Sequence, residues 1–118
     1  MKLSIEEDVP SHVQVKVEGN VTQRDLEKLA DPLSDLLGPG VYDRLVLINL
    51  RDAKYLDSSG VGWLLACHKR FRTHGGKLVL HSLQPLVVNV LHVLRLDTLF
   101  YIAANRQAAL ELTREAQV

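Results

Sequence analysis

The sequence contains a single cysteine, no excess charge of either sign and no long apolar run. One cysteine, Cys67, cannot form an internal disulfide, which favours a reducing compartment. Fourteen basic and fourteen acidic residues cancel, whereas nucleic-acid-binding proteins usually carry a basic excess, so we expect no direct contact with nucleic acid. The apolar runs are too short to span a bilayer, and the N-terminus turns acidic at Glu6, too early for a signal peptide. We therefore expect a cytoplasmic protein that does not insert into membranes.

Length and composition predict one globular domain over residues 1–118. Of the 118 residues, 47% are hydrophobic and 24% are charged, which is ordinary for a soluble protein. The sequence shows no internal repeat, low-complexity tract or linker that would divide it. A chain of this length buries about two-thirds of its unfolded surface, so it needs no disulfide or metal to fold.

Hydrophobic periodicity predicts an α/β fold with the order β-β-α-β-α-β-α-β-α. Alternating or continuous apolar residues indicate strands at positions 2–6, 13–17, 45–50, 77–81 and 99–102. The first two strands should form an antiparallel hairpin. The run 45–50 is apolar enough to be covered on both faces, as in a parallel sheet. Alternation with about four helices then predicts a mixed, mostly parallel sheet.

Local signals predict the limits of the first helix. Gly19 and Asn20 should end the second strand. Thr22 followed by Asp25 has the spacing of a capping box, in which a hydroxyl and a carboxylate each accept a backbone N–H. Pro32 falls within the apolar pattern of the helix and should kink it or end its first segment.

Similar signals bound the later helices. Gly75–Gly76 should stop the second helix. Pro85 suits the first turn of the third helix, and Asn105 can cap the fourth. The apolar face of the third helix should comprise Leu86, Val87, Val90, Leu91 and Leu94, and that of the fourth Ala109, Leu112 and Ala116.

A small polar turn follows the buried strand 45–50 and a short connection over residues 51–56. Its residues, Asp57-Ser58-Ser59-Gly60, open a helix. Their hydroxyls therefore lie at a helix N-terminus, where a negative charge is well tolerated. Asp and Ser are also favoured N-cap residues, each worth about 1 kcal/mol relative to alanine. A purely structural cap and a functional turn both fit these residues.

The sequence patterns of common enzyme sites are not matched. The nucleophile elbow of hydrolases reads Gly-x-Ser-x-Gly, whereas this turn reads Leu56-Asp57-Ser58-Ser59-Gly60. The five histidines are scattered without zinc-site spacing, and His68 falls on an apolar helix face. Gly60-Val61-Gly62 begins like a dinucleotide fingerprint, but Leu65 replaces the third glycine, so a nucleotide-binding domain has only this turn in its favour. We expect no enzyme activity, no cofactor and no metal.

The combination of an apolar strand, a short connection and Asp57-Ser58-Ser59-Gly60-Val61-Gly62 at a helix start closely resembles the bacterial anti-sigma factor antagonists. These proteins are stand-alone STAS domains. Further similarity lies in the glycine after the second strand and in three segments, Gly75–Leu78, Pro85–Val87 and Leu96–Phe100. The resemblance covers nearly the whole chain and implies a STAS-like fold.

The resemblance also implies a phosphorylation switch at Ser58, in a switch turn completed by Asp57, Ser59 and Gly60. In this family, the serine directly after the aspartate is phosphorylated by a partner that is both an anti-sigma factor and a kinase. The unphosphorylated form binds that partner, which then releases its sigma factor, and a phosphatase resets the phosphorylated form. Family members often carry an acidic-apolar-acidic sequence after the second strand, where this chain has Asn20-Val21-Thr22. A second hypothesis is therefore a STAS scaffold in a signalling or transport assembly that is not phosphorylated.

Three residues are candidate contacts for such a partner. A step of about 100° per residue places Trp63 on a helix face with Ser59 and Arg70, away from the apolar face. Trp and Arg dominate binding hot spots, so Trp63 and Arg70 are candidates. Thr22, in the segment expected near the switch turn, is the third. The alternative for Trp63 is that it packs against the third helix.

Overall fold

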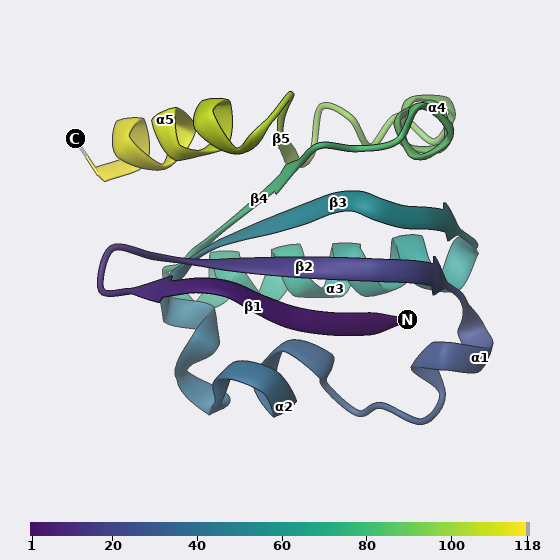
Figure 1. Cartoon of the computed structure of the whole chain (residues 1–118), viewed down its shortest axis with the longest axis horizontal. Coiled ribbons are helices and arrows are strands. Elements are labelled where there is room, and N and C mark those ends of the chain that lie inside the picture. The colour runs from purple at the N-terminus through teal and green to yellow at the C-terminus, as the bar shows by residue number, and fades with distance from the viewer. Residues whose placement is uncertain (118) are drawn as a thin grey trace.

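The fold is a single five-stranded mixed sheet with helices on both faces (Figure 1). The computed structural model describes residues 1–117 and the side chains of residues 1–112. The first two strands form an antiparallel hairpin and each later pair is parallel, as predicted. The spatial order follows the chain: β1 (Lys2–Val9), β2 (His12–Val21), β3 (Leu45–Leu56), β4 (Lys77–His81) and β5 (Tyr101–Ala103).

The helices connect these strands in the predicted α/β order, with the first helical region divided into three short pieces. These pieces are α1 (Gln23–Leu26), α2 (Pro32–Leu37) and the 3₁₀ helix η1 (Pro39–Asp43). The later connections are single helices: α3 (Ser58–His74), α4 (Pro85–Val93) and α5 (Arg106–Gln117). In Figure 1, α3 runs along β2 and β3, whereas α4 and α5 lie beside β4 and β5.

The predicted helix is interrupted, but Pro32 neither kinks it nor ends its first segment, because α1 already ends at Leu26. Pro32 is the first residue of α2, where its missing N–H costs nothing. Asp31 caps α2 by accepting a hydrogen bond from the Ser34 N–H at 3.2 Å. The chain between Leu26 and Asp31 thus bends away from α1 rather than continuing as one helix.

The first three strands all run further than predicted. Strand β1 reaches Val9 instead of residue 6, and β2 and β3 are longer because they pair with each other. Strand β2 continues through Gly19 to Val21, with Gly19 at a φ of +85° and an irregular register between Gly19 and Asn20. Glycine permits this left-handed conformation inside a strand, so it bends β2 without ending it. Likewise, residues 51–56 are not a connection but the second half of β3, because they pair with the extended β2.

Several local signals are confirmed by the structure. Strand β4 has the predicted bounds, and Pro85 is the first residue of α4. Gly75 ends α3 with a φ of +84°, and the Asn105 Oδ1 accepts the Ala108 N–H at 2.9 Å at the start of α5. The predicted strand at 99–102 is displaced, since β5 spans Tyr101–Ala103.

The predicted apolar face of α4 is only partly buried. Val87 and Leu91 are fully buried, whereas Leu86 and Leu94 are each 51% exposed, which corrects the prediction for these two. Leu94 lies beyond the last residue of α4. In α5, Ala109 is buried, and the side chain of Ala116 lies outside the described residues.

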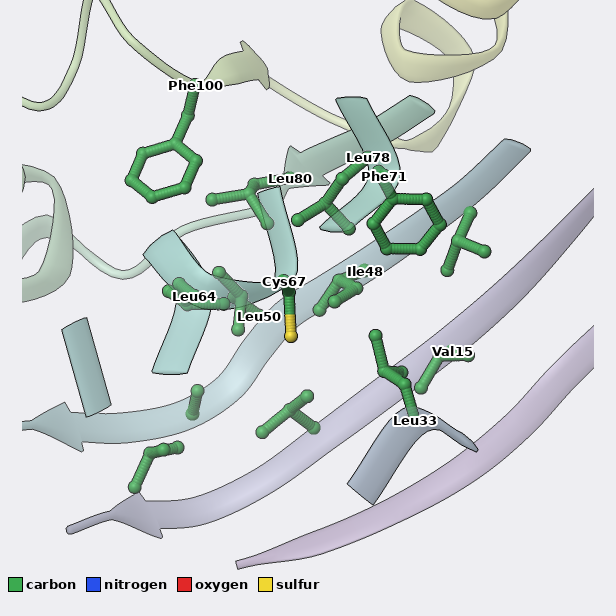
Figure 2. Packing of buried hydrophobic residues seen from close by; sticks show 14 of the residues in the cluster. Val15, Leu33, Ile48, Leu50, Leu64, Cys67, Phe71, Leu78, Leu80 and Phe100 are labelled. Carbon is green, nitrogen blue, oxygen red and sulfur yellow. The ribbon is translucent and has the colours of Figure 1, made fainter. Parts of the chain in front are cut away.

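The main core lies between the sheet and the layer containing α2, α3 and α4. Figure 2 shows Phe71, Leu64 and Cys67 from α3 packed with Ile48, Leu50 and Leu80 from the central strands. A smaller cluster on the other face joins Leu47 and Val79 to Ala109 of α5. Burial on both faces explains why β3 and β4 begin as continuous apolar runs. The main cluster also packs α3 against the sheet.

Candidate functional site

Asp57 ties the first turn of α3 to α1 through its side chain and to the end of β2 through its backbone N–H. Its Oδ1 accepts the Gly60 N–H at 2.9 Å, as an N-cap does, and its Oδ2 accepts the Gln23 N–H of α1 at 3.0 Å. The Asp57 N–H donates to the Val21 carbonyl at 3.3 Å. These backbone donors, Gln23 first, lower the pKa of Asp57. A fixed carboxylate therefore stands beside Ser58 at neutral pH.

Gly60 is required by close packing against the strand. It is buried in the first turn of α3, and a Cβ at this position would overlap the Val21 carbonyl oxygen and the Leu56 side chain. Because one of these atoms belongs to the backbone of β2, no rotamer change could relieve the overlap. Gly60 thus sets how closely the start of α3 approaches the sheet.

Ser58 occupies the first position of α3 and is exposed. Its hydroxyl forms no hydrogen bond to any other residue within the described part of the chain. Asp57 supplies the cap, so the Ser58 hydroxyl is not needed to hold the helix start. The neighbouring Ser59 is only partly exposed. The helix N-terminus at Ser58 carries about half a positive charge, which suits an added anion.

Trp63 lines a shallow hollow beside this turn. The hollow has a volume of about 380 Å³ and lies between α3, α1 and the segment that leads to α2; its lining includes Gln23, Leu26, Leu29, Pro32, Ser59 and Trp63. Trp63 is half-buried, packs against the core, and its Nε1 is buried without a hydrogen-bond partner among the described residues. The prediction that Trp63 points outward therefore needs correction, and its neighbours in the hollow come from α1 rather than from α4.

Thr22 does not form the predicted capping box. Its hydroxyl donates to the Asp25 Oδ2 at 2.9 Å, and its backbone carbonyl accepts the N–H groups of Asp25 and Leu26. The other carboxylate oxygen of Asp25 lies 3.2 Å from the Met1 amino group, and the Thr22 N–H makes only the smallest of the contributions that lower the pKa of Asp25. The next residue, Gln23, bonds Asp57, which brings the Thr22 segment to the switch turn. In Figure 1, α1 lies next to the carboxyl ends of β2 and β3.

Arg70 lies further along α3 and is held by intramolecular contacts. Its side chain is 47% exposed, with an Nη1 to Asp31 Oδ2 distance of 2.8 Å. Nη1 also donates to the Tyr42 hydroxyl at 3.3 Å, and the guanidinium lies 5.7 Å from the centre of the Tyr42 ring. Arg70 thus ties α3 to α2 and η1, in addition to any role in partner binding.

Sequence reasoning missed the contact between Gln23 and Asp57 and the hollow around Trp63. The hydrogen bond joins residues 34 positions apart, and no local sequence pattern at Gln23 predicts it. The hollow depends on the break between α1 and α2, whose only sequence signal is Pro32.

The fold and the site place the start of α3, with its Asp57 cap, at the surface. A rigidly capped helix start presents a free hydroxyl beside a shallow apolar hollow. Among the side chains that the structure describes, those of residues 1–112, no group of three or more His, Cys, Asp or Glu could hold a metal ion. No helix within residues 1–117 is long and apolar enough to cross a membrane.

The chain belongs to the STAS domain family. Residues 6–113 match the family described as "Mlab, STAS domain". STAS domains of the anti-sigma factor antagonist type are in general not enzymes, which agrees with the sequence-based prediction.

Solved structures of anti-sigma factor antagonists share the fold. A Thermotoga maritima protein described as a candidate antagonist superposes with a TM-score of 0.84 at 20% identity, over 95% of this chain and 94% of that one. The antagonist SpoIIAA in its unphosphorylated form gives 0.67 at 18% identity, over 96% and 98% of the two chains. SpoIIAA from Bacillus in its phosphorylated form gives 0.66 at 19% identity, over 94% and 99%. At these identities the likeness establishes the fold.

Proposed function

We propose that this chain is an anti-sigma factor antagonist whose partner binding is switched by phosphorylation of Ser58. The partner is an anti-sigma factor with serine-kinase activity, and binding the unphosphorylated form makes it release its sigma factor. A phosphatase acting on phospho-Ser58 resets the switch. The observation that carries this proposal is the exposed, unbonded hydroxyl of Ser58 directly after the Asp57 cap. The existence of SpoIIAA structures in both phosphorylation states supports it.

The electrostatics of the turn support a local switch. A phosphate brings a charge of about −1.5 to −2 at neutral pH. The positive end of α3 tolerates this charge, so the fold can remain unchanged. The Asp57 carboxylate beside it, held by Gln23 and Gly60, repels the phosphate, and an interface over the turn would have to bury both charges. A loss of about 3 kcal/mol in binding would weaken the complex by about a hundredfold.

The hollow beside the turn is the proposed contact surface for the partner. Trp63 lines it, and Thr22 directly precedes α1, which contributes Gln23 and Leu26 to the lining. Arg70 lies twelve residues beyond Ser58, or about 18 Å along α3, so it would contact only the far edge of a partner. We retain all three as proposed contacts, with Trp63 the most important.

Phosphorylation can be tested directly. The protein is incubated with its cognate kinase and ATP, and the phosphate is located by mass spectrometry. We expect labelling at Ser58, loss of labelling in Ser58→Ala and full labelling in the matched control Ser59→Ala. Labelling at another residue, or none with an active kinase, would refute the switch.

The functional consequence is tested with Ser58→Asp. Because Ser58 is exposed and is not the cap, this variant should lose at least tenfold in partner affinity while its melting temperature stays close to wild type. Affinity is measured by calorimetry and melting by circular dichroism. Parallel loss of affinity and of stability would mean that Ser58 is mainly structural.

A second candidate function is a STAS scaffold that is not phosphorylated, in a signalling or transport assembly. The segment Asn20-Val21-Thr22 favours it, because it lacks the carboxylates that many phosphorylated relatives carry there. If the chain is such a scaffold, the wild-type protein and the Ser58→Asp variant should bind the partner with equal affinity. Under either function we propose a cytoplasmic protein in which residues 1–118 form one STAS domain, without direct contact to nucleic acid.

A further inference from the structure

A second hollow lies at the opposite end of α3 from Ser58. It has a volume of about 320 Å³ and is formed by the last turns of α3 and the first residues of β3, β4 and β5. Its lining includes His68, Arg72, Gly76, Lys77, Leu78 and Tyr101. Small-molecule sites begin at about 300 Å³, so the hollow has room for a compact ligand. Ten residues separate His68 from Ser58, or about 15 Å along the helix.

Every ionisable side chain in this lining apart from Tyr101 is basic, and no lining residue is acidic. Within the described part of the chain, the Arg72 guanidinium forms no ion pair or hydrogen bond. The Lys77 Nζ donates one hydrogen bond, to the Leu112 carbonyl at 3.2 Å, and lies 4.1 Å from the centre of the Tyr101 ring. An ammonium group has three donors, so Lys77 retains capacity for a ligand. In a chain with zero net charge, this is a local positive excess.

His68 adds an imidazole ring to the lining of the hollow. The residue is only 4% exposed, and its ring packs against Phe100 and Tyr101 with centroid distances of 5.4 and 6.5 Å. Neither ring nitrogen forms a hydrogen bond to another described residue. These nitrogens are not among the fully enclosed side-chain atoms that lack a partner, so they are open to the hollow, and the aromatic contacts hold the ring where a ligand could reach it.

The end of α3 does not cancel this positive excess. The carboxyl end of a helix carries about half a negative charge, whereas Arg72 and Lys77 carry two formal positive charges. The Phe71 carbonyl is also satisfied by the N–H groups of Gly75 and Gly76. The net field in the hollow therefore favours an anion.

We propose that this hollow binds a small phosphate monoester, with Arg72, Lys77 and His68 holding the phosphate. A monoester carries about −1.5 to −2 charges at pH 7, which matches the two unneutralised cations. The apolar side chains of Leu78 and Phe71 line the space left for the organic part. The site is independent of the proposed switch, because it shares no residue with the turn at Ser58.

The test is a titration of the ¹⁵N-labelled protein with ribose 5-phosphate, followed by NMR. We expect saturable shifts of the Gly75, Gly76 and Lys77 amides, and no such shifts with ribose. Burial, followed by the charge of Arg72, lowers the pKa of His68. A bound phosphate should therefore raise the pKa of His68, measured from its ring proton signals.

The decisive variant is Arg72→Gln, because it removes a charge without breaking any contact among the described residues. It should weaken binding of ribose 5-phosphate at least fivefold. The double variant Arg72→Gln/Lys77→Gln should weaken it at least twentyfold. Lys28→Gln, an equal charge change on an exposed residue outside the hollow, should leave the affinity unchanged. Shifts that do not saturate, that centre on Ser58, or that survive Arg72→Gln unchanged would overturn the proposal.

Discussion

Replacing Gly60 by alanine should destabilise the protein, although alanine is the better helix former. In an open helix position the change would stabilise by about 0.5–1 kcal/mol. At Gly60 the added methyl meets the Val21 carbonyl oxygen and the Leu56 side chain, and overpacking of this kind costs about 1–3 kcal/mol. Because the Val21 oxygen is part of a paired strand, we expect the upper part of that range and a net loss of about 1–2 kcal/mol.

The same helix provides the matched control. Gly62 lies two residues further along α3, is exposed, and has no atom within 4 Å of an added Cβ. Gly62→Ala should therefore stabilise the protein, and the two variants should differ by about 2–3 kcal/mol in urea denaturation. In thermal melts, about 3–6 °C should correspond to each kcal/mol in a chain of this size. If Gly60→Ala proved as stable as Gly62→Ala, the close approach of α3 to β2 would be refuted.

Three further predictions concern the residues around α3. Backbone hydrogen bonds lower the pKa of Asp57, so its ionisation stabilises the fold above about pH 4, and this stabilisation is lost as the pH falls through the lowered pKa. The melting temperature of Asp57→Asn should therefore decrease less on acidification than that of the wild-type protein. Burial raises the pKa of the Cys67 thiol to about 12, so a disulfide reagent at pH 8 should label it only in urea-unfolded protein; rapid labelling of the native state would contradict this. Trp63 is the only tryptophan, so partner binding over the hollow should shift its fluorescence, and an unchanged spectrum on binding would exclude contact there.

The limits of elements were predictable where the signal and its effect lie within a few residues. Pro85, Gly75 and Asn105 act on backbone groups of their own or the adjacent turn, so their roles could be predicted without knowledge of the fold. The bounds of β4 were predictable because a short apolar run lies between Gly76 and a polar segment.

Prediction failed where the structure depends on distant partners. The residues from Arg51 to Tyr55 are polar enough to suggest a connection, yet they form strand because Asp52, Ala53 and Tyr55 pair with β2. Thr22 and Asp25 have capping-box spacing, but the Met1 amino group takes one of the carboxylate oxygens. In the strand, a contact from far along the chain outweighed the local preference, whereas at Thr22 the hydroxyl donates to the nearby Asp25 carboxylate instead of accepting a backbone N–H.

The motif at the start of α3 also combines features set by local sequence with features set by distant contacts. The sequence alone determined that Asp57-Ser58-Ser59-Gly60 starts a helix after a buried strand and resembles a STAS switch turn, because caps and apolar runs act locally. Only the tertiary structure decided that Asp57 reaches Gln23, that Trp63 turns into a hollow beside α1, and that His68, Arg72 and Lys77 meet around one cavity. These arrangements arise from packing between segments that are far apart in the sequence, and no local pattern specifies which segments meet.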